Sequence, residues 1–106
     1  MGWRNTTLTI LSGATSSEEL NLTENAARRK KDLLFIAPTT LPETVTVHLA
    51  EAPGGTYQAL AEGGSNVTLP AAKATPVRGI TAGALKLIAL AVAADRVFFV
   101  RGNAVD

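Results

Sequence analysis

Apolar and polar residues alternate along much of the chain, and this period of two is typical of β-strands with one buried face. The clearest case is the segment 44–49, in which every second residue from Val45 to Leu49 is predicted to point inward. The same alternation predicts shorter strands over 7–11 and 66–69. The sequence therefore indicates a strand-rich fold.

Two pairs of adjacent glycines, at 54–55 and 63–64, lie in the middle of the chain. Glycine adopts the positive φ that tight hairpin loops require, so these pairs favour turns between strands. Together with the alternation, they predict a three-stranded antiparallel meander over 43–51, 56–61 and 65–70.

Two further strands are predicted from their apolar content. The segment 31–36 begins with Lys31 and Asp32, continues as the apolar run Leu33 to Ile36 and is closed by Pro38, as expected of a central strand covered on both faces. The segment 96–101 forms the last strand, ended by Gly102-Asn103. Phe98 and Phe99 are adjacent within it and must face opposite ways, so one is core and the other is exposed or meets a partner.

The segment from Ala82 to Ala94 is ambiguous, because its many Ala and Leu residues are also good helix formers. The alternation of Leu85, Leu87 and Ala89 with their neighbours favours a strand. A helix over these residues remains the alternative.

Seven to nine short strands with turns between them predict an all-β fold, an antiparallel β-sandwich of jelly-roll or immunoglobulin-like type. A length of 106 residues fits one domain. Within it, residues 1–30 form an N-terminal arm or edge-strand region and residues 31–106 form the sandwich. If the arm interpretation holds, deletion of residues 1–12 leaves the domain folded.

Composition removes several kinds of chemistry. The chain has no Cys and one His, which excludes disulfides, thiolate nucleophiles, Cys-containing zinc sites and sites with several His ligands. His48 lies on the polar face of its predicted strand, without a carboxylate pattern suited to acid–base catalysis. We therefore expect no catalytic residues, no metal and no cofactor, and a protein that is not an enzyme.

The most apolar stretch, from Ile80 to Val92, contains Lys86 and is too short to span a membrane. The N-terminus lacks the apolar core of a signal peptide, so we expect synthesis in the cytoplasm and no membrane partner.

The strongest charge feature is the run Arg28, Arg29, Lys30 and Lys31. It fits a solvated connector or a contact with an acidic protein surface. Nucleic acid is disfavoured as a partner, because no aromatic side chains accompany the four cations. Trp3 lies close to the terminus, where a large side chain packs on its own domain or reaches a neighbouring subunit. These five residues are the candidate partner-binding residues.

Charge alternates in sign along the chain. Residues 1–31 and 73–106 are net positive, whereas 32–72 hold four acidic residues and no Lys or Arg. If the fold keeps these segments apart, acidic and basic patches can orient neighbouring subunits head to tail. If the fold interleaves them, the fields cancel.

Three stretches resemble small β-rich virion proteins of tailed bacteriophages: LPETVTVHLAEAPGGTYQAL at 41–60, VTLPAAKAT at 67–75 and AADRVFFVRGN at 93–103. The resemblance covers roughly residues 31–103. It implies a homo-oligomeric structural protein of the virion, a capsid decoration (cement) protein that binds the major capsid protein or other virion proteins. A head-tail connector or tail ring component is the alternative location.

A different class, a small carbohydrate- or ligand-binding β-module, requires Trp3, His48 and Tyr57 to converge on one face.

Overall fold

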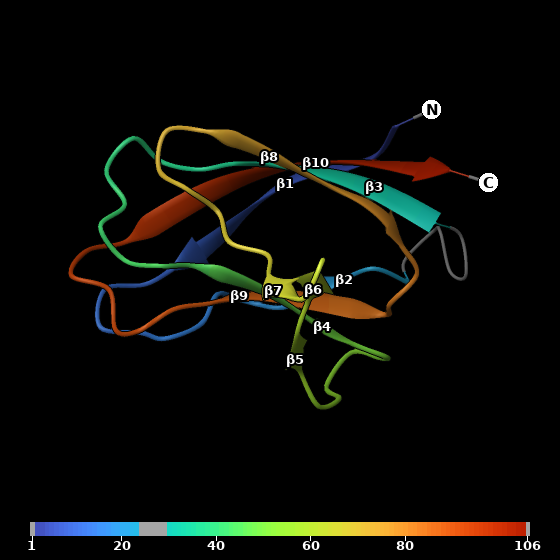
Figure 1. The fold of residues 1–106 in the computed structure, drawn as a ribbon, viewed down its shortest axis with the longest axis horizontal. Coiled ribbons are helices and arrows are strands. Elements are labelled where there is room, and N and C mark those ends of the chain that lie inside the picture. Colours follow the sequence, from blue (N-terminus) through green and yellow to red (C-terminus); the bar gives the residue numbers. More distant parts are fainter. Residues whose placement is uncertain (1, 24–29, 106) are drawn as a thin grey trace.

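Residues 2–23 and 30–105 are described by the computed structural model, and they form ten strands in two facing sheets and a small hairpin (Figure 1). The strands are β1 (Gly2–Ile10), β2 (Leu20–Asn21), β3 (Lys30–Ile36), β4 (Thr46–Ala50), β5 (Gln58–Ala59), β6 (Ala61–Glu62), β7 (Ser65–Asn66), β8 (Ala74–Ile80), β9 (Ala84–Ile88) and β10 (Arg96–Val105).

The two sheets lie one above the other in Figure 1. The upper sheet has the strand order β1-β10-β3-β8, and the lower sheet has the order β2-β9-β4-β5. Strands β6 and β7 form a separate two-stranded hairpin. All of these strand pairs are antiparallel. The prediction of an all-β antiparallel sandwich is confirmed.

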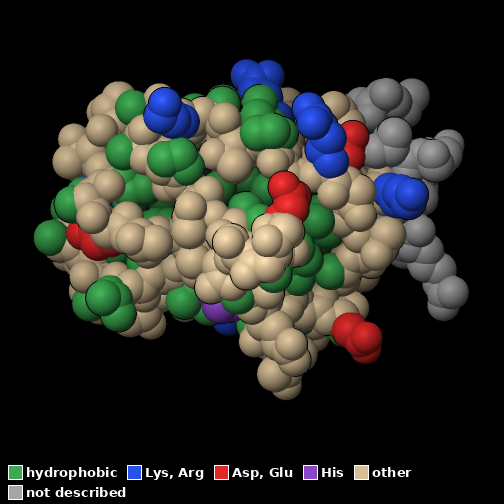
Figure 2. All heavy atoms as spheres, viewed as in Figure 1, with side chains coloured by type: hydrophobic (Ala, Val, Ile, Leu, Met, Phe, Trp, Pro, Cys, Tyr) green, Lys and Arg blue, Asp and Glu red, His purple; other side chains and the backbone are tan. Residues whose placement is uncertain are grey.

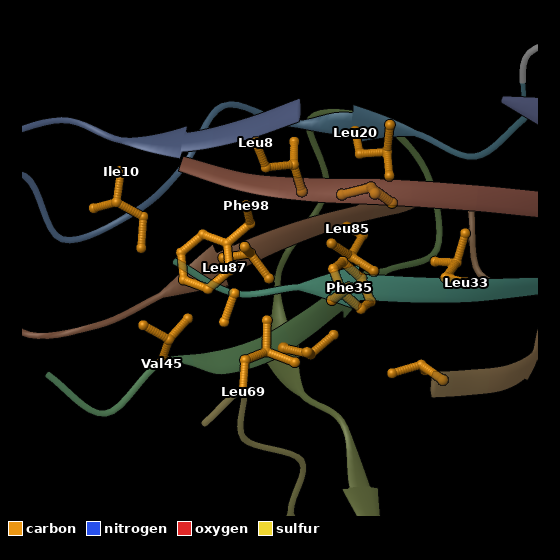
Figure 3. Packing of buried hydrophobic residues seen from close by; sticks show 14 of the residues in the cluster. Leu8, Ile10, Leu20, Leu33, Phe35, Val45, Leu69, Leu85, Leu87 and Phe98 are labelled. Atoms are coloured by element: carbon orange, nitrogen blue, oxygen red, sulfur yellow. The ribbon is translucent and has the colours of Figure 1, made fainter. Parts of the chain in front are cut away.

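The core lies between the inner faces of the sheets. Leu8, Phe35 and Phe98 of the upper sheet and Leu85 and Leu87 of the lower sheet are all at most 1% exposed, and Figure 3 shows them in one cluster. Along each strand, these residues alternate with more exposed neighbours. The exception is Leu85, because its neighbour Ala84 is also buried. Burial of such side chains stabilises the fold by about 1.5–3 kcal/mol each.

The N-terminal region contributes an edge strand. Strand β1 pairs with β10 from Gly2 to Ile10, and both Leu8 and Ile10 are in the core. Of the two predicted interpretations of residues 1–30, an arm or an edge strand, β1 is an edge strand of the upper sheet, and the short β2 is an edge strand of the lower one.

The ambiguous segment after Gly83 is a strand. Strand β9 pairs with β2 on one side and with β4 on the other, and Leu85, Leu87 and Ala89 are buried as the alternation predicted. The apolar side chains of β9 therefore cover the core from within a sheet, and this tertiary position outweighs the helix propensity of Ala and Leu.

The predicted three-stranded meander is confirmed in part: β5 pairs with β4, and 61–62 pair with 65–66, but the third segment also returns to β4. Strand β5 pairs with the second half of β4, but Thr68 bridges to Thr46 in the first half of the same strand. Leu69 is buried, and its N–H donates to the carbonyl of Val45 at 3.0 Å. Burial of Leu69 thus returns the chain to β4, and the intervening β6–β7 hairpin projects from this edge.

The predicted end of the last strand at Gly102 is also wrong, because β10 continues to Val105. Gly102 lies in the middle of the upper sheet, where it is opposite Arg4 of β1 and Leu33 of β3. Backbone hydrogen bonds to strands on both sides keep this glycine extended.

Gly83 lies where the chain passes closest to the end of β4. Its N–H donates to the carbonyl of Ala50 at 2.9 Å, and a Cβ at Gly83 would lie 2.1 Å from the backbone oxygen of Glu51. Because that oxygen belongs to backbone, Gly83→Ala is expected to lower the free energy of unfolding by about 1–3 kcal/mol in urea denaturation. Thr81→Ala, a nearby exposed change, is the control. Equal stability of the two variants would contradict the close approach.

Candidate functional site

The outer face of the upper sheet exposes an aromatic side chain. Phe98 and Phe99 face opposite ways as predicted: Phe98 is 0% exposed in the core, and Phe99 is 56% exposed. The alternation of β10 also places Val97, which is 38% exposed, on the outer face beside Phe99. Strand β10 thus presents apolar side chains to both sides of the sheet.

Neighbouring strands extend this surface. Phe99 lies opposite Ile36 of β3, and the next outward position of β3 is Leu34, opposite Pro76 of β8. Leu34 and Ile36 are only half-buried, so the prediction that segment 31–36 is covered on both faces is wrong. The run is apolar because its inward residues pack in the core and its outward residues, Leu34 and Ile36, are apolar as well. We call this surface the apolar face: Leu34, Ile36, Ala74, Pro76, Val97 and Phe99.

Cations lie along part of the border of the apolar face, whereas its β1 side carries Thr7 and Thr9, opposite Phe99 and Val97. Lys30 at the start of β3, Arg78 of β8 and Arg101 of β10 are exposed, as is Lys73 just before β8. Figure 2 shows Lys and Arg side chains along the side of the molecule formed by the upper sheet. The acidic Asp32 of β3 is half-buried and accepts a hydrogen bond from the Gly79 N–H at 2.9 Å. The surface is therefore apolar at its centre and basic along part of its rim.

Of the five candidate partner-binding residues, the structure places the side chains of Lys30 and Lys31, which lie on opposite faces of β3. Lys30 is exposed, whereas Lys31 is 1% exposed because it shares the inward row of β3 with Leu33 and Phe35. Lys31 therefore does not belong to the exposed basic rim. Trp3 lies in β1 of the upper sheet. Arg28 and Arg29 lie outside the described residues.

A groove of about 760 Å³ lies on the open side of the sandwich, between β5 and the chain that follows β8. Its apolar residues include Leu49, Leu60 and Ile80. Glu51, which is exposed, lines it, and Glu62 is exposed on the adjoining β6. We call this the acidic groove: Leu49, Glu51, Gln58, Leu60, Ile80 and Thr81.

A polar cluster covers part of the lower sheet. The Tyr57 hydroxyl donates to the Glu19 carboxylate, which also accepts the Gly54 N–H at 2.8 Å. The Lys86 Nζ lies 5.0 Å from the centre of the Tyr57 ring. The Gly54 and Tyr57 hydrogen bonds lower the pKa of Glu19, and burial raises the pKa of Tyr57. These contacts hold the β4–β5 loop against the sheet.

His48 lies beside this cluster, opposite Lys86 in the β4–β9 ladder. Its Nε2 is 2.9 Å from the Thr46 hydroxyl, and burial lowers the pKa of the imidazole. His48 and Tyr57 therefore both flank Lys86. Trp3 lies in β1 of the upper sheet, whereas His48 lies in β4 of the lower sheet.

An ion pair ties the connection after β3 to the start of β10. The Arg96 Nε donates to Glu43 at 3.0 Å and its Nη2 at 3.2 Å, while Nη1 donates to the Thr40 carbonyl at 3.4 Å. Both side chains are largely buried. Here an acid from the negative middle segment meets a cation from the positive last segment, so the charges of the chain are partly interleaved.

This ion pair predicts a pH dependence of stability. The Arg96 hydrogen bonds lower the pKa of Glu43 in the folded state, so its contribution is present above the ordinary Glu pKa and is lost as the pH falls through the lowered value. Glu43→Gln is therefore expected to destabilise the protein more at neutral than at strongly acidic pH, measured by urea denaturation. Glu62→Gln, at an exposed position, is the control. An equal loss for Glu43→Gln at both pH values would contradict this role.

Among residues 2–23 and 30–105, no group of three or more His, Asp or Glu could hold a metal ion. No helix within these residues has the length and apolarity needed to cross a membrane. Comparison with protein-family models, curated proteins and solved structures found no match.

Proposed function

We propose that this chain is a structural virion protein of a tailed phage, a capsid decoration (cement) protein that stabilises the head through protein–protein contacts. The observation that carries the proposal is the apolar face, where Phe99 is 56% exposed beside Val97 and Ile36. A contiguous apolar patch with a polar rim marks a surface that binds another protein. The resemblance of residues 31–103 to small phage virion proteins supplies the class of particle.

The size of the domain supports an assembly role. A chain of 106 residues has a limited core, and contacts with neighbouring subunits add stability by mass action. The basic rim of Lys30, Lys73, Arg78 and Arg101 favours a partner surface with acidic residues.

Cosedimentation tests the proposal directly. The purified chain is mixed with heads assembled from the major capsid protein of the same phage genome, and bound protein is measured against concentration. We expect saturable binding that weakens at least tenfold for Phe99→Thr and is unchanged for Leu90→Thr, a control at a position that is 84% exposed. No binding by the unaltered chain would overturn the decoration role. Binding to purified connectors or tails, but not to heads, would assign the protein to the connector or the tail instead.

A further inference from the structure

We propose that the apolar face of one copy docks on the acidic groove of a second copy, so that copies associate head to tail. This inference rests on the proposed structural function and names a second copy, rather than the head surface, as the direct partner of the apolar face. Phe99→Thr then weakens binding to heads because copies no longer associate there. Its two surfaces lie on different parts of the same chain, the outer face of the upper sheet and the open side of the sandwich.

Charge disfavours the simpler alternative, in which two copies pack their apolar faces together. In that arrangement the exposed Lys30, Arg78 and Arg101 of one copy would approach the same residues of the other. Like charges across an interface cost free energy and suppress that pairing. The apolar face therefore needs a partner surface with acidic residues.

The acidic groove supplies such a surface. Glu51 lines the groove and is exposed, Glu62 is exposed on the adjoining β6, and residues 33–72, which supply most of the groove, include no Lys or Arg. Its volume of about 760 Å³ accommodates an aromatic side chain, and Leu60 and Ile80 provide apolar contacts. The groove is thus complementary to the apolar face in both charge and apolar character.

The positions on β10 fit this contact. Arg101 is two residues after Phe99 and points to the same outer side, because side chains alternate along the strand. When Phe99 enters the groove of a second copy, Arg101 approaches the acidic residues at its rim. The interface uses two different patches, so a pair of copies still has one free face and one free groove, and association continues into a ring or a filament.

Mixing two variants tests this arrangement. Phe99→Thr removes the exposed aromatic but keeps the groove, and Thr81→Trp fills the groove at an exposed position but keeps the face. Light scattering is expected to show that the unaltered chain associates as concentration rises and that each variant alone is a monomer. An equimolar mixture of the variants is expected to form a one-to-one dimer. Leu90→Thr, the control, should associate like the unaltered chain.

A charge exchange provides a second readout. Arg101→Glu and Glu51→Arg are each expected to weaken association at least tenfold, and the chain carrying both changes should recover most of it. Circular dichroism verifies that each variant is folded. A monomeric unaltered chain at every concentration, a mixture that stays monomeric, or no recovery in the double variant would overturn the inference. If the chain is monomeric but still binds heads saturably, the inferred self-association fails while the proposed function stands. The two proposals can therefore fail separately.

Discussion

A chain that lacks residues 1–10 is expected not to fold. The deletion removes β1, with Leu8 and Ile10 from the core, and leaves one edge of β10 unpaired. Loss of a buried Leu or Ile side chain costs about 2–5 kcal/mol. Two such losses and a missing strand are comparable with the total stability of a small domain, about 5–15 kcal/mol. Circular dichroism and thermal unfolding of the purified truncated chain measure the result.

A peptide added in trans provides the control. Residues 1–12 as a synthetic peptide are expected to restore the folded signal of the truncated chain by pairing with β10, whereas the same peptide with Leu8→Ser and Ile10→Ser is not. Cooperative unfolding of the truncated chain without peptide would instead support the arm interpretation. The sequence left these two interpretations open, because a strand of alternating Leu and Thr residues is equally compatible with pairing in its own domain or in a neighbour.

The strands themselves were largely predictable, because burial on one face imposes a period of two. Val45 and Val47 are fully buried as the alternation indicated, and β9 is a strand despite its helix formers. The pairing of strands was less predictable. The return of Leu69 to β4 depends on which part of the core it fills, and the extension of β10 through Gly102 depends on partners on both sides.

The candidate site was likewise predictable only in part. Alternation predicted that Phe98 and Phe99 face opposite sides, but it could not assign which is buried. That assignment follows from register, which places Phe99 opposite Ile36 on the outer face. The basic run was visible in the sequence, but its burial pattern was not: Lys31 shares the inward row with Leu33. When a strand begins within a run of charged residues, successive side chains point to opposite faces of the sheet, so the charges do not all lie on one surface.

Replacement of the two adjacent phenylalanines is expected to separate folding from association. Phe98→Ala creates a cavity at a fully buried position between the sheets, so it should lower the free energy of unfolding by about 3–5 kcal/mol. Phe99→Ala removes a side chain that is 56% exposed and should change stability by less than about 1 kcal/mol. Urea denaturation of dilute protein, where self-association is absent, measures both values.

The same pair should show the opposite order in association. Phe99→Ala is expected to abolish concentration-dependent association while the domain stays folded. The folded fraction of Phe98→Ala keeps the apolar face and should still associate. Because association favours the folded state, a higher protein concentration should raise the apparent stability of this variant. A large stability loss in Phe99→Ala would show that this ring supports the sheet rather than a partner. Unaltered stability in Phe98→Ala would contradict the core position of that ring.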